Sequence, residues 1–248
     1  MSKYLKINNL SYSYPDGHEA LKDISFSIQK RESIAILGPN GAGKTTLILH
    51  LNGILGSLSG KIEVDGLKYT TENIAKIRET VGVVFQDPDD QLFMPTVIED
   101  VMFGPKNFGY SNEDAEKNAV EALRMVGMDD FQDRAPHHLS FGQKRKIAIA
   151  TVLASKPKLL VLDEPASNLD PASRRDLIEI LKNLNISIIL VTHDLPMALE
   201  ICERSLILNE GEIKEDSQTK TILKNEKIMK ENRLELPFGF ALHHLGDE

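Results

Sequence analysis

Features that would place a protein outside the cell or within a bilayer are missing from this sequence. Cys202 is the single cysteine, so no disulfide can form within the chain, and a reducing cytoplasm fits this composition. No apolar run reaches the roughly 18–20 residues that a membrane-spanning helix requires. The first residues, MSKYLKINNL, lack the charged and apolar regions of a secretory signal. We therefore expect a cytoplasmic protein that contacts a membrane only through a protein partner or a local patch.

An excess of positive charge is also missing. The 248 residues carry a formal net charge of −8 at pH 7, which argues against nucleic acid as the principal partner, because neutralising phosphates requires clustered Lys and Arg. Hydrophobic residues make up 41% and charged residues 27%, as in ordinary soluble globular proteins. The length fits one large domain or one domain with an added lobe.

Strand and helix patterns alternate along the chain, which predicts an α/β fold. Four short apolar runs predict buried strands of a mainly parallel sheet: 33–38, 81–86, 158–165 and 187–194. Near the N-terminus, residues 3–14 and 20–28 alternate between apolar and polar positions. This alternation predicts an antiparallel pair whose first strand is an edge strand, and residues 60–69 resume strand character.

Helices are predicted between these strands. Apolar residues recur at helical spacing over 44–55, 111–128 and 139–157, and a further helix begins at Pro171. Ser111 and Ser140 are the expected N-caps. Residues 87–110 predict irregular backbone, because prolines and carboxylates interrupt any helical or strand pattern there.

A phosphate-binding loop lies between the first buried strand and the first helix. GPNGAGKT, residues 38–45, matches the pattern G-x-x-x-x-G-K-[ST]. The glycines let successive N–H groups face the phosphates of a nucleotide, and the helix N-terminus adds partial positive charge. Lys44 would reach the β- and γ-phosphates, and Thr45 would ligate Mg²⁺. A flexible glycine turn is the alternative, which the strand–loop–helix context disfavours. The candidate ATP-binding residues here are Gly38, Pro39, Asn40, Gly41, Ala42, Gly43, Lys44, Thr45 and Thr46.

Two acids end a later apolar strand. In LLVLDE, residues 159–164, Asp163 would hold Mg²⁺ through water and Glu164 would polarise the attacking water. Such a strand is a weak signal alone, because sheet strands often end in polar residues. Its position downstream of the phosphate loop strengthens the interpretation.

The stretch LSFGQ, residues 139–143, makes the pattern specific. Lying between the phosphate loop and the acidic strand, it makes the chain resemble the ATP-binding subunit of an ATP-binding-cassette (ABC) transporter. Leu139, Ser140, Gly142 and Gln143 match that family's signature, whereas Phe141 stands where glycine is usual. The resemblance implies that two subunits pair head to tail, with each ATP between one phosphate loop and the partner's signature.

The resemblance also implies catalytic roles for residues outside these motifs. Gln86 resembles the glutamine that contacts Mg²⁺ and the attacking water. His193 resembles the switch histidine that contacts the γ-phosphate. With Glu164, these are the candidate catalytic residues.

Two further matches concern the subunit interface and the base. Asn168, Leu169 and Asp170 resemble the loop that crosses the dimer interface. Tyr14 resembles the aromatic residue that stacks on adenine, and Tyr12 is the competing candidate.

Residues 86–109, QDPDDQLFMPTVIEDVMFGPKNFG, resemble one branch of the family, the energy-coupling-factor importers of vitamins and of cobalt or nickel. We call these residues the partner segment. In that branch the segment forms a groove for a coupling helix of the membrane subunit. The expected contacts are Phe93, Met94 and Val97 for apolar helix residues, and Asp87, Asp89 and Asp90 for arginines. A solvated acidic loop is the alternative.

The resemblance predicts a single ABC-type P-loop domain over 1–248. Residues 1–86 and 158–215 would form the nucleotide-binding core with an antiparallel β subdomain, 87–157 a helical lobe with the signature, and 216–248 a tail. The tail's apolar patch, 236–242, would pack between subunits or on its own domain. His243 and His244 near the end of the chain are not expected to bind a metal.

The implied cofactors are ATP and Mg²⁺, and the implied location is the cytoplasmic face of the cell membrane. The implied partners are a second ATPase subunit, identical or different, a transmembrane coupling subunit and a substrate-binding membrane subunit. The ATPase of another importer class, an exporter ATPase and a non-transport cassette acting on nucleic acid are the alternatives.

Overall fold

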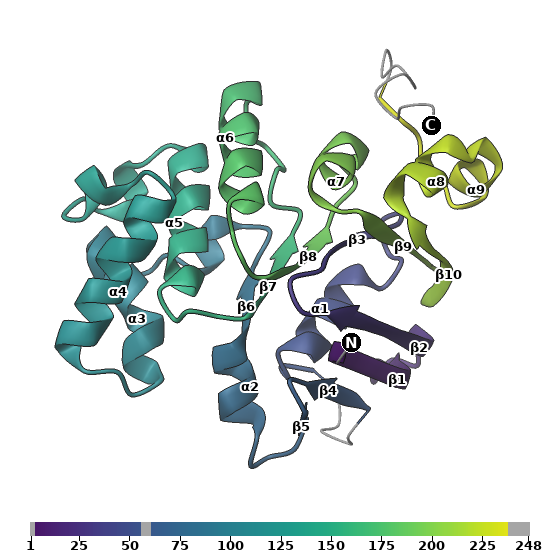
Figure 1. Ribbon diagram of the computed structural model, residues 1–248, viewed down its shortest axis with the longest axis horizontal. Helices are drawn as coiled ribbons and strands as arrows, with labels where there is room; N and C mark the ends of the chain where they lie inside the picture. The colour runs from purple at the N-terminus through teal and green to yellow at the C-terminus, as the bar shows by residue number, and fades with distance from the viewer. Residues whose placement is uncertain (1–2, 56–60, 238–248) are drawn as a thin grey trace. The chain divides into compact units, whose positions relative to one another are not determined.

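The computed structural model describes residues 3–55 and 61–237 (Figure 1). Its contacts divide the chain into two compact units, one from residues 1–74 with 187–248 and the other from 75–186. We describe each unit by itself. The division into core, lobe and tail stays a prediction. Most of the patch 236–242, together with His243 and His244, lies outside the described residues.

The first unit contains a four-stranded antiparallel sheet in the order β2-β1-β4-β5. Its strands are β1 (Lys3–Ser13), β2 (Glu19–Gln29), β4 (Ile62–Val64) and β5 (Leu67–Lys68). The predicted antiparallel pair is confirmed, but the prediction of an edge strand is wrong, because β1 also pairs with β4. Alternating burial reports which face of a strand is covered and says nothing about how many neighbours it has.

A second set of strands in this unit carries the phosphate loop. In it, β3 (Ser33–Leu37) runs parallel to both β8 (Ser187–Val191) and β9 (Arg204–Asn209), and β10 (Glu212–Gln218) pairs antiparallel with β9. The central strands β3 and β8 are buried almost throughout. The helix α1 (Lys44–Leu51) directly follows the loop after β3.

The predicted polar tail is in fact partly ordered structure. The last three residues of β10 lie in it, followed by α8 (Thr219–Lys224) and α9 (Glu226–Glu231). Leu223 and Met229 are buried, and α8 contacts both α7 (Leu195–Ile201) and α9 (Figure 1). The sequence pattern missed these elements because they are short and bury few apolar side chains each.

The second unit pairs two parallel strands with a group of helices. The helix α2 (Ile74–Thr80) leads into β6 (Val81–Val84), which runs parallel to the fully buried β7 (Leu159–Asp163). The helices α3 (Val97–Asn107), α4 (Asn112–Met125) and α5 (Phe141–Leu153) lie side by side (Figure 1). Short 3₁₀ turns at Asp129–Phe131 and Pro136–His138 connect α4 to α5, and α6 (Pro171–Lys182) follows β7.

The prediction of irregular backbone over 87–110 is wrong for half of that stretch. A 3₁₀ turn, η1 (Pro88–Asp90), is followed by the regular helix α3. Thr96 and Glu99 form a reciprocal capping box, which satisfies two of the free N–H groups at the helix start. Pro95 lies before the cap and Pro105 in the last turns, so neither prevents the helix, although both obscured it in the sequence.

The other predicted helix starts are confirmed. The Ser111 hydroxyl accepts a hydrogen bond from the Asp114 N–H at 3.0 Å, and Ser140 caps α5. Pro171 occupies the first turn of α6, with Asp170 as its N-cap. Among the described residues, no helix is both long enough and apolar enough to cross a membrane.

Candidate functional site

The phosphate loop between β3 and α1 runs against neighbouring backbone, which explains two of its glycines. A Cβ at Gly38, where φ is 153°, would lie 2.0 Å from the Leu208 carbonyl oxygen. At Gly43, where φ is 103°, it would lie 2.4 Å from the Ala20 carbonyl oxygen. Any larger residue would push the loop away from β2 and β9, so the glycines set the path of the loop as well as its conformation.

Lys44 is folded back over this loop. Its side chain is 8% exposed, and Nζ donates to the carbonyl oxygens of Gly38 at 2.7 Å and Pro39 at 3.0 Å. A cation is therefore already held inside the curve of the loop. The next residue, Thr45, is exposed, whereas Thr46 is buried. This arrangement suits an anionic ligand with several phosphate groups.

Tyr14 is closer to the loop than its competitor Tyr12. The Tyr14 hydroxyl lies 3.0 Å from the Thr46 hydroxyl, whereas the Tyr12 ring packs edge-on against the His50 ring with centroids 4.7 Å apart. The geometry favours Tyr14 as the aromatic residue beside the nucleotide, and its stacking on adenine stays a prediction.

His50 was not singled out in the sequence, where it is one residue of a helical pattern. It is 3% exposed, and its Nδ1–H donates to the Thr46 carbonyl oxygen at 2.7 Å. Burial lowers the pKa of His50. The neutral ring therefore supports the loop helix from behind and adds no charge.

His193 lies at the carboxyl end of β8, beside the strand that leads into the loop. The Thr192 N–H donates to the Ile36 carbonyl oxygen at 3.3 Å, which joins the end of β8 to the end of β3. His193 itself is exposed. Within this unit, the structure therefore brings Lys44, Tyr14 and His193 to one end of the parallel strands, where ligands bind in open α/β sheets.

In the second unit, the acidic candidates also lie at the carboxyl ends of parallel strands. Because Val84 of β6 pairs with Leu162 of β7, the residues that follow both strands emerge at one edge. Asp163 is 5% exposed and Glu164 is 7% exposed, whereas Gln86 is exposed. Oxygen donors gathered at a strand end suit a hard cation such as Mg²⁺.

Glu164 also has an unusual backbone conformation. Its φ is 45°, in the left-handed region that a residue with a side chain enters at a cost of roughly 1–2 kcal/mol. Strain of this kind gathers at functional sites, where the surroundings hold a side chain in one direction. The strain supports the interpretation of Glu164 as a site residue.

The signature forms the first turn of α5. The Ser140 N–H donates to the Gln143 side chain at 2.9 Å, and the Ser140 hydroxyl accepts from the Gln143 N–H at 3.3 Å. A Cβ at Gly142 would lie 2.8 Å from the Ser173 hydroxyl oxygen of α6, so this glycine permits close helix packing. Leu139 is buried, and the Phe141 ring covers the guanidinium of Arg145 at 5.3 Å.

The loop after Glu164 ends on the cap of α6. Asn168 has a φ of 62°, and Leu169 follows it. The Asp170 carboxylate accepts from the Ser173 hydroxyl at 2.6 Å and from backbone N–H groups, and the hydroxyl bond is the main cause of its lowered pKa. The Asp170 carboxylate therefore stays ionised at the helix start.

The partner segment exposes aromatic side chains, though not all those predicted. Phe93 is 60% exposed, and its ring meets the ring of Phe103 edge-to-face at 4.9 Å. Met94 is partly exposed, but Val97 is fully buried, so its expected contact with a partner is wrong. Phe103, 38% exposed, was missed because the sequence pattern did not predict the helix α3 that presents it.

The acids of the partner segment are partly engaged within the chain. Asp89 forms an ion pair with Lys144 at 2.7 Å through one carboxylate oxygen, and its side chain is 61% exposed. Asp87 caps η1 and accepts from the Asp89 N–H. Asp90 is exposed. All three predicted acids therefore lie at the surface, and Asp89 already has one partner within the chain.

A buried acid that the sequence pattern did not reveal shapes this segment. Asp100 is 3% exposed, and one of its carboxylate oxygens accepts from the N–H groups of Phe93 and Met94, both at 3.0 Å. Burial raises the pKa of Asp100. The acid fixes the turn that exposes Phe93.

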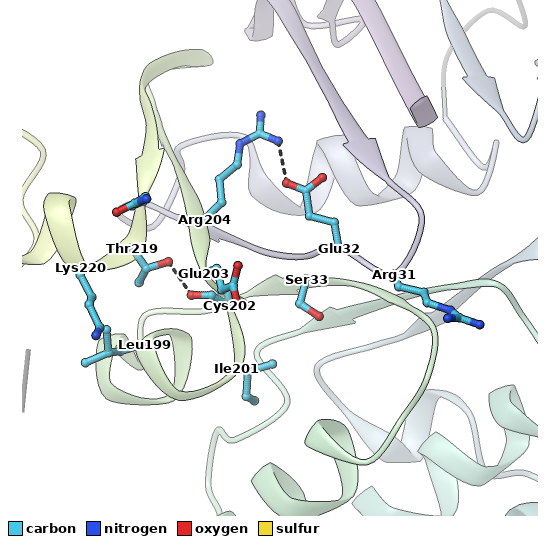
Figure 2. Close-up of a pocket in the computed structure, with 11 residues that line it drawn as sticks. Arg31, Glu32, Ser33, Leu199, Ile201, Cys202, Glu203, Arg204, Thr219 and Lys220 are labelled. Atoms are coloured by element: carbon cyan, nitrogen blue, oxygen red, sulfur yellow. Dashed lines mark hydrogen bonds and ion pairs between the residues drawn. The ribbon is translucent and has the colours of Figure 1, made fainter. Parts of the chain in front are cut away.

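A separate hollow in the first unit is lined by residues 31–33, 201–204 and 218–220, together with Leu199 (Figure 2). Its cavity volume is about 580 Å³, and Figure 2 shows the Arg204 guanidinium pointing toward Glu32, 2.9 Å away. Arg204 also pairs with Asp216, and the Thr219 hydroxyl donates to the Cys202 carbonyl oxygen. Arg204 and Glu32 pair with each other in its lining, and none of the predicted site residues lines it.

Comparison with known proteins gives consistent results. Residues 21–167 match the family described as ABC transporter. A putative ABC transporter ATP-binding protein of Streptomyces coelicolor is 56% identical and covers 95% of this chain and 91% of its own length. The energy-coupling factor transporter ATP-binding protein EcfA of Methanosphaera stadtmanae is 45% identical over 96% of this chain and 87% of its own length.

Two solved structures are similar in fold. The first is cbiO1 from Clostridium perfringens, described as part of the ABC transporter complex cbiONQ. It matches with a TM-score of 0.82 and 39% identity over 96% of this chain and 97% of its own. The second is a dimeric ATP-binding cassette in a post-hydrolysis state with ADP and Pi. It has a TM-score of 0.76 and 30% identity, covering 87% of this chain and 98% of its own.

Proposed function

We propose a function for this chain from one established premise: the chain belongs to the ABC transporter family. The ATP-binding proteins of this family are ATPases, and this chain is an ATPase. We propose that it is the ATP-hydrolysing subunit of an energy-coupling-factor importer. The assignment as an ATP-hydrolysing subunit rests on the phosphate loop, in which the carbonyl oxygens of Gly38 and Pro39 hold Lys44. The choice of branch rests on the partner segment.

The phosphate loop would bind the nucleotide through its N–H groups and Lys44. On binding, Lys44 would exchange the two carbonyl oxygens for phosphate oxygens, which carry full negative charge and form stronger bonds. Tyr14 would lie against the base, and His193 would contact the γ-phosphate. Each of these side chains lies in the first unit.

Thr45, Gln86 and Asp163 would hold Mg²⁺, since all three offer oxygen donors. When bound, Mg²⁺ neutralises charge that builds up on the phosphate oxygens. Glu164 would orient and polarise the water that attacks the γ-phosphate. Phosphoryl transfer needs positioning and charge stabilisation more than covalent chemistry, and these residues would supply both.

A second ATPase subunit would complete the site. Ser140, Gly142 and Gln143 at the start of α5 present a helix N-terminus, which favours the anionic γ-phosphate of the partner's ATP. ATP would therefore stabilise the closed pair, and hydrolysis would release it. The pair is identical or mixed, and the chain would lie on the cytoplasmic face of the membrane.

The partner segment favours the energy-coupling-factor branch over other importers. Phe93, Met94 and Phe103 form an exposed apolar surface with Asp90 nearby in the chain, which suits a coupling helix with apolar and arginine side chains. We propose cobalt, nickel or a vitamin as the imported substrate. An ATPase of another importer class would share the ATP site and differ here.

Replacing Glu164 with Gln tests the hydrolytic assignment. The variant keeps the shape of the side chain but removes the charge that polarises water, so we expect steady-state ATP hydrolysis to be abolished and an ATP-bound dimer to accumulate. Phosphate release and size-exclusion chromatography with light scattering measure the two effects. Glu116→Gln, on the exposed face of α4, is the matched control. Normal turnover by Glu164→Gln would contradict the proposal.

A further inference from the structure

Arg145, two residues after the signature, holds the backbone at the end of β6. Its side chain is 1% exposed, the largest among the fully buried side chains described. One terminal nitrogen donates to the Phe85 carbonyl oxygen at 2.8 Å, and the other donates to the Gln86 carbonyl oxygen at 2.5 Å. The planar guanidinium therefore spans two successive carbonyl groups, at the point where the chain leaves β6 for the partner segment.

Phe141 supports this arrangement from the signature itself. Its ring lies over the Arg145 guanidinium, 5.3 Å from the ring centroid. A cation over an aromatic face is attracted by the electrons of the ring, and the attraction grows when water is excluded. Phe141 is the one residue of LSFGQ that departs from the family pattern, and the structure shows what its ring contacts.

Arg145 is a charged side chain at a fully buried position, where arginine is found only when its donors have partners. Burial lowers the pKa of Arg145, while the carboxylates of Asp87 and Asp163 favour its charged form. A buried cation costs more than an apolar side chain of the same size, so its presence indicates a requirement for its bonds. Lysine could donate to these carbonyl groups only as a point charge, without the fork geometry.

A second tie lies beside the first. Lys144, the preceding residue of α5, forms the 2.7 Å ion pair with Asp89 in η1. Two consecutive side chains of the signature helix thus contact this stretch, Arg145 through the backbone of Phe85 and Gln86 and Lys144 through the side chain of Asp89. These contacts join the signature to the start of the partner segment within one unit. They would transmit a shift of α5 to that segment.

We propose that Arg145, covered by Phe141, is a positioning residue that holds the backbone of Gln86 to the signature helix. Movement of α5 against a partner's ATP then moves Gln86 and the partner segment together. This inference rests on the proposed function for the roles of Gln86 and the signature. It assigns to Phe141 and Arg145 a role that depends on their geometry and not on contact with the nucleotide.

Arg145→Lys tests the proposal, because it keeps the charge and loses the fork. We expect kcat for ATP hydrolysis to fall by roughly 10- to 100-fold, the scale of a small misplacement of reacting groups, with KM for ATP unchanged. Phe141→Leu keeps apolar bulk and should lower kcat by less. The double variant should be no slower than Arg145→Lys, because the ring acts through the guanidinium. Lys146→Gln, which removes an exposed ion pair from the same helix, is the control and should leave kcat unchanged.

Hydrogen exchange gives a readout that does not depend on catalysis. In Arg145→Lys, amides of residues 85–92 should exchange faster, while those of β1 stay unchanged. Wild-type kcat in this variant, additive effects of the two substitutions, or unchanged exchange would overturn the proposal.

If Arg145→Lys fails to fold, Phe141→Leu decides: a lower kcat at unchanged KM and melting temperature supports the inference, and an unchanged kcat overturns it. If the wild-type chain hydrolyses no ATP, the proposed function is overturned. Amide hydrogen exchange in residues 85–92 would still test whether Arg145 holds this backbone.

Discussion

Gly38 and Gly109 both have a positive φ, but only at Gly38 does another backbone occupy the place of a side chain. The Leu208 carbonyl oxygen would lie 2.0 Å from a Cβ at Gly38, whereas nothing lies within 4 Å at Gly109, where φ is 88°. The same substitution at these two positions therefore separates the cost of conformation from the cost of collision.

Gly38→Ala should lower the free energy of unfolding by about 2–5 kcal/mol, since strain of roughly 1–2 kcal/mol adds to overpacking of roughly 1–3 kcal/mol. Gly109→Ala should cost only the conformational part, about 1–2 kcal/mol. Urea unfolding measures both. Equal losses at the two positions would contradict the interpretation that Gly38 is needed because the loop runs so close to β9.

The buried carboxyl of Asp100 predicts a dependence of stability on pH. Burial raises its pKa above the ordinary value of 3.8, so its contribution to stability is fully present below that value and is lost as the pH rises through the folded-state pKa. Asp100→Asn keeps an oxygen acceptor for the N–H groups of Phe93 and Met94 without the charge. The variant should therefore gain stability relative to the wild type as the pH rises from below 3.8 to neutral. Urea unfolding across that range measures the difference, and a constant difference would contradict the prediction.

At the scale of elements, α3 shows how local chemistry starts a helix within a proline-rich stretch. The Thr96 hydroxyl accepts from the Glu99 N–H at 3.4 Å, and the Glu99 carboxylate accepts from the Thr96 N–H at 3.1 Å. The helix then presents Phe103 on the outside and Asp100 on the inside. The cap therefore determines which side chains of the partner segment face solvent.

Thr96→Ala should lower the free energy of unfolding by about 1 kcal/mol, the usual cost of losing an N-cap side chain. Thr221→Ala, at an exposed position of α8, is the matched control and should change it by less than about 0.5 kcal/mol. Thermal or urea unfolding compares the two. Similar losses in both variants would mean that the capping box does not stabilise α3.

At the scale of the whole molecule, the family assignment made from the motifs is confirmed, as is the α/β fold class. The proposed branch rests on the partner segment. Of its acids, Asp89 pairs with Lys144 of α5, whereas Asp90 is exposed. A substitution at Asp90 or Phe93 therefore tests the surface without disturbing the tie to α5.

Phe93→Ser and Asp90→Lys should each weaken the complex with the membrane coupling subunit while ATP binding stays intact. We expect Phe93→Ser to reduce the affinity by about tenfold or more, as for a central aromatic side chain of an interface. Co-purification and substrate uptake by reconstituted vesicles measure the effect. Met125→Ser, exposed on α4 outside the surface, is the control. Unchanged assembly and uptake would indicate that this surface does not contact the membrane subunit.

Much of the site could be read from contiguous residues. The phosphate loop, the signature and the acids after β7 are each defined by neighbours in the chain, because they depend on local turns, strand ends and helix caps. Ser140 and Asp170 were recognisable for the same reason. Gln86 and His193 needed the resemblance, since a single residue after a strand has no local pattern.

The remaining features depend on contacts between distant parts of the chain. Val97 was predicted to contact a partner and is buried. The ion pair of Asp89 with Lys144 and the bonds of Arg145 to two carbonyl oxygens were not visible in the sequence. The sequence by itself determined the ATPase motifs and their order, because the chemistry of each lies in adjacent residues. Only the tertiary structure decided which side chains remain free for a partner and which hold the loop in place, because burial and pairing depend on what packs against each residue.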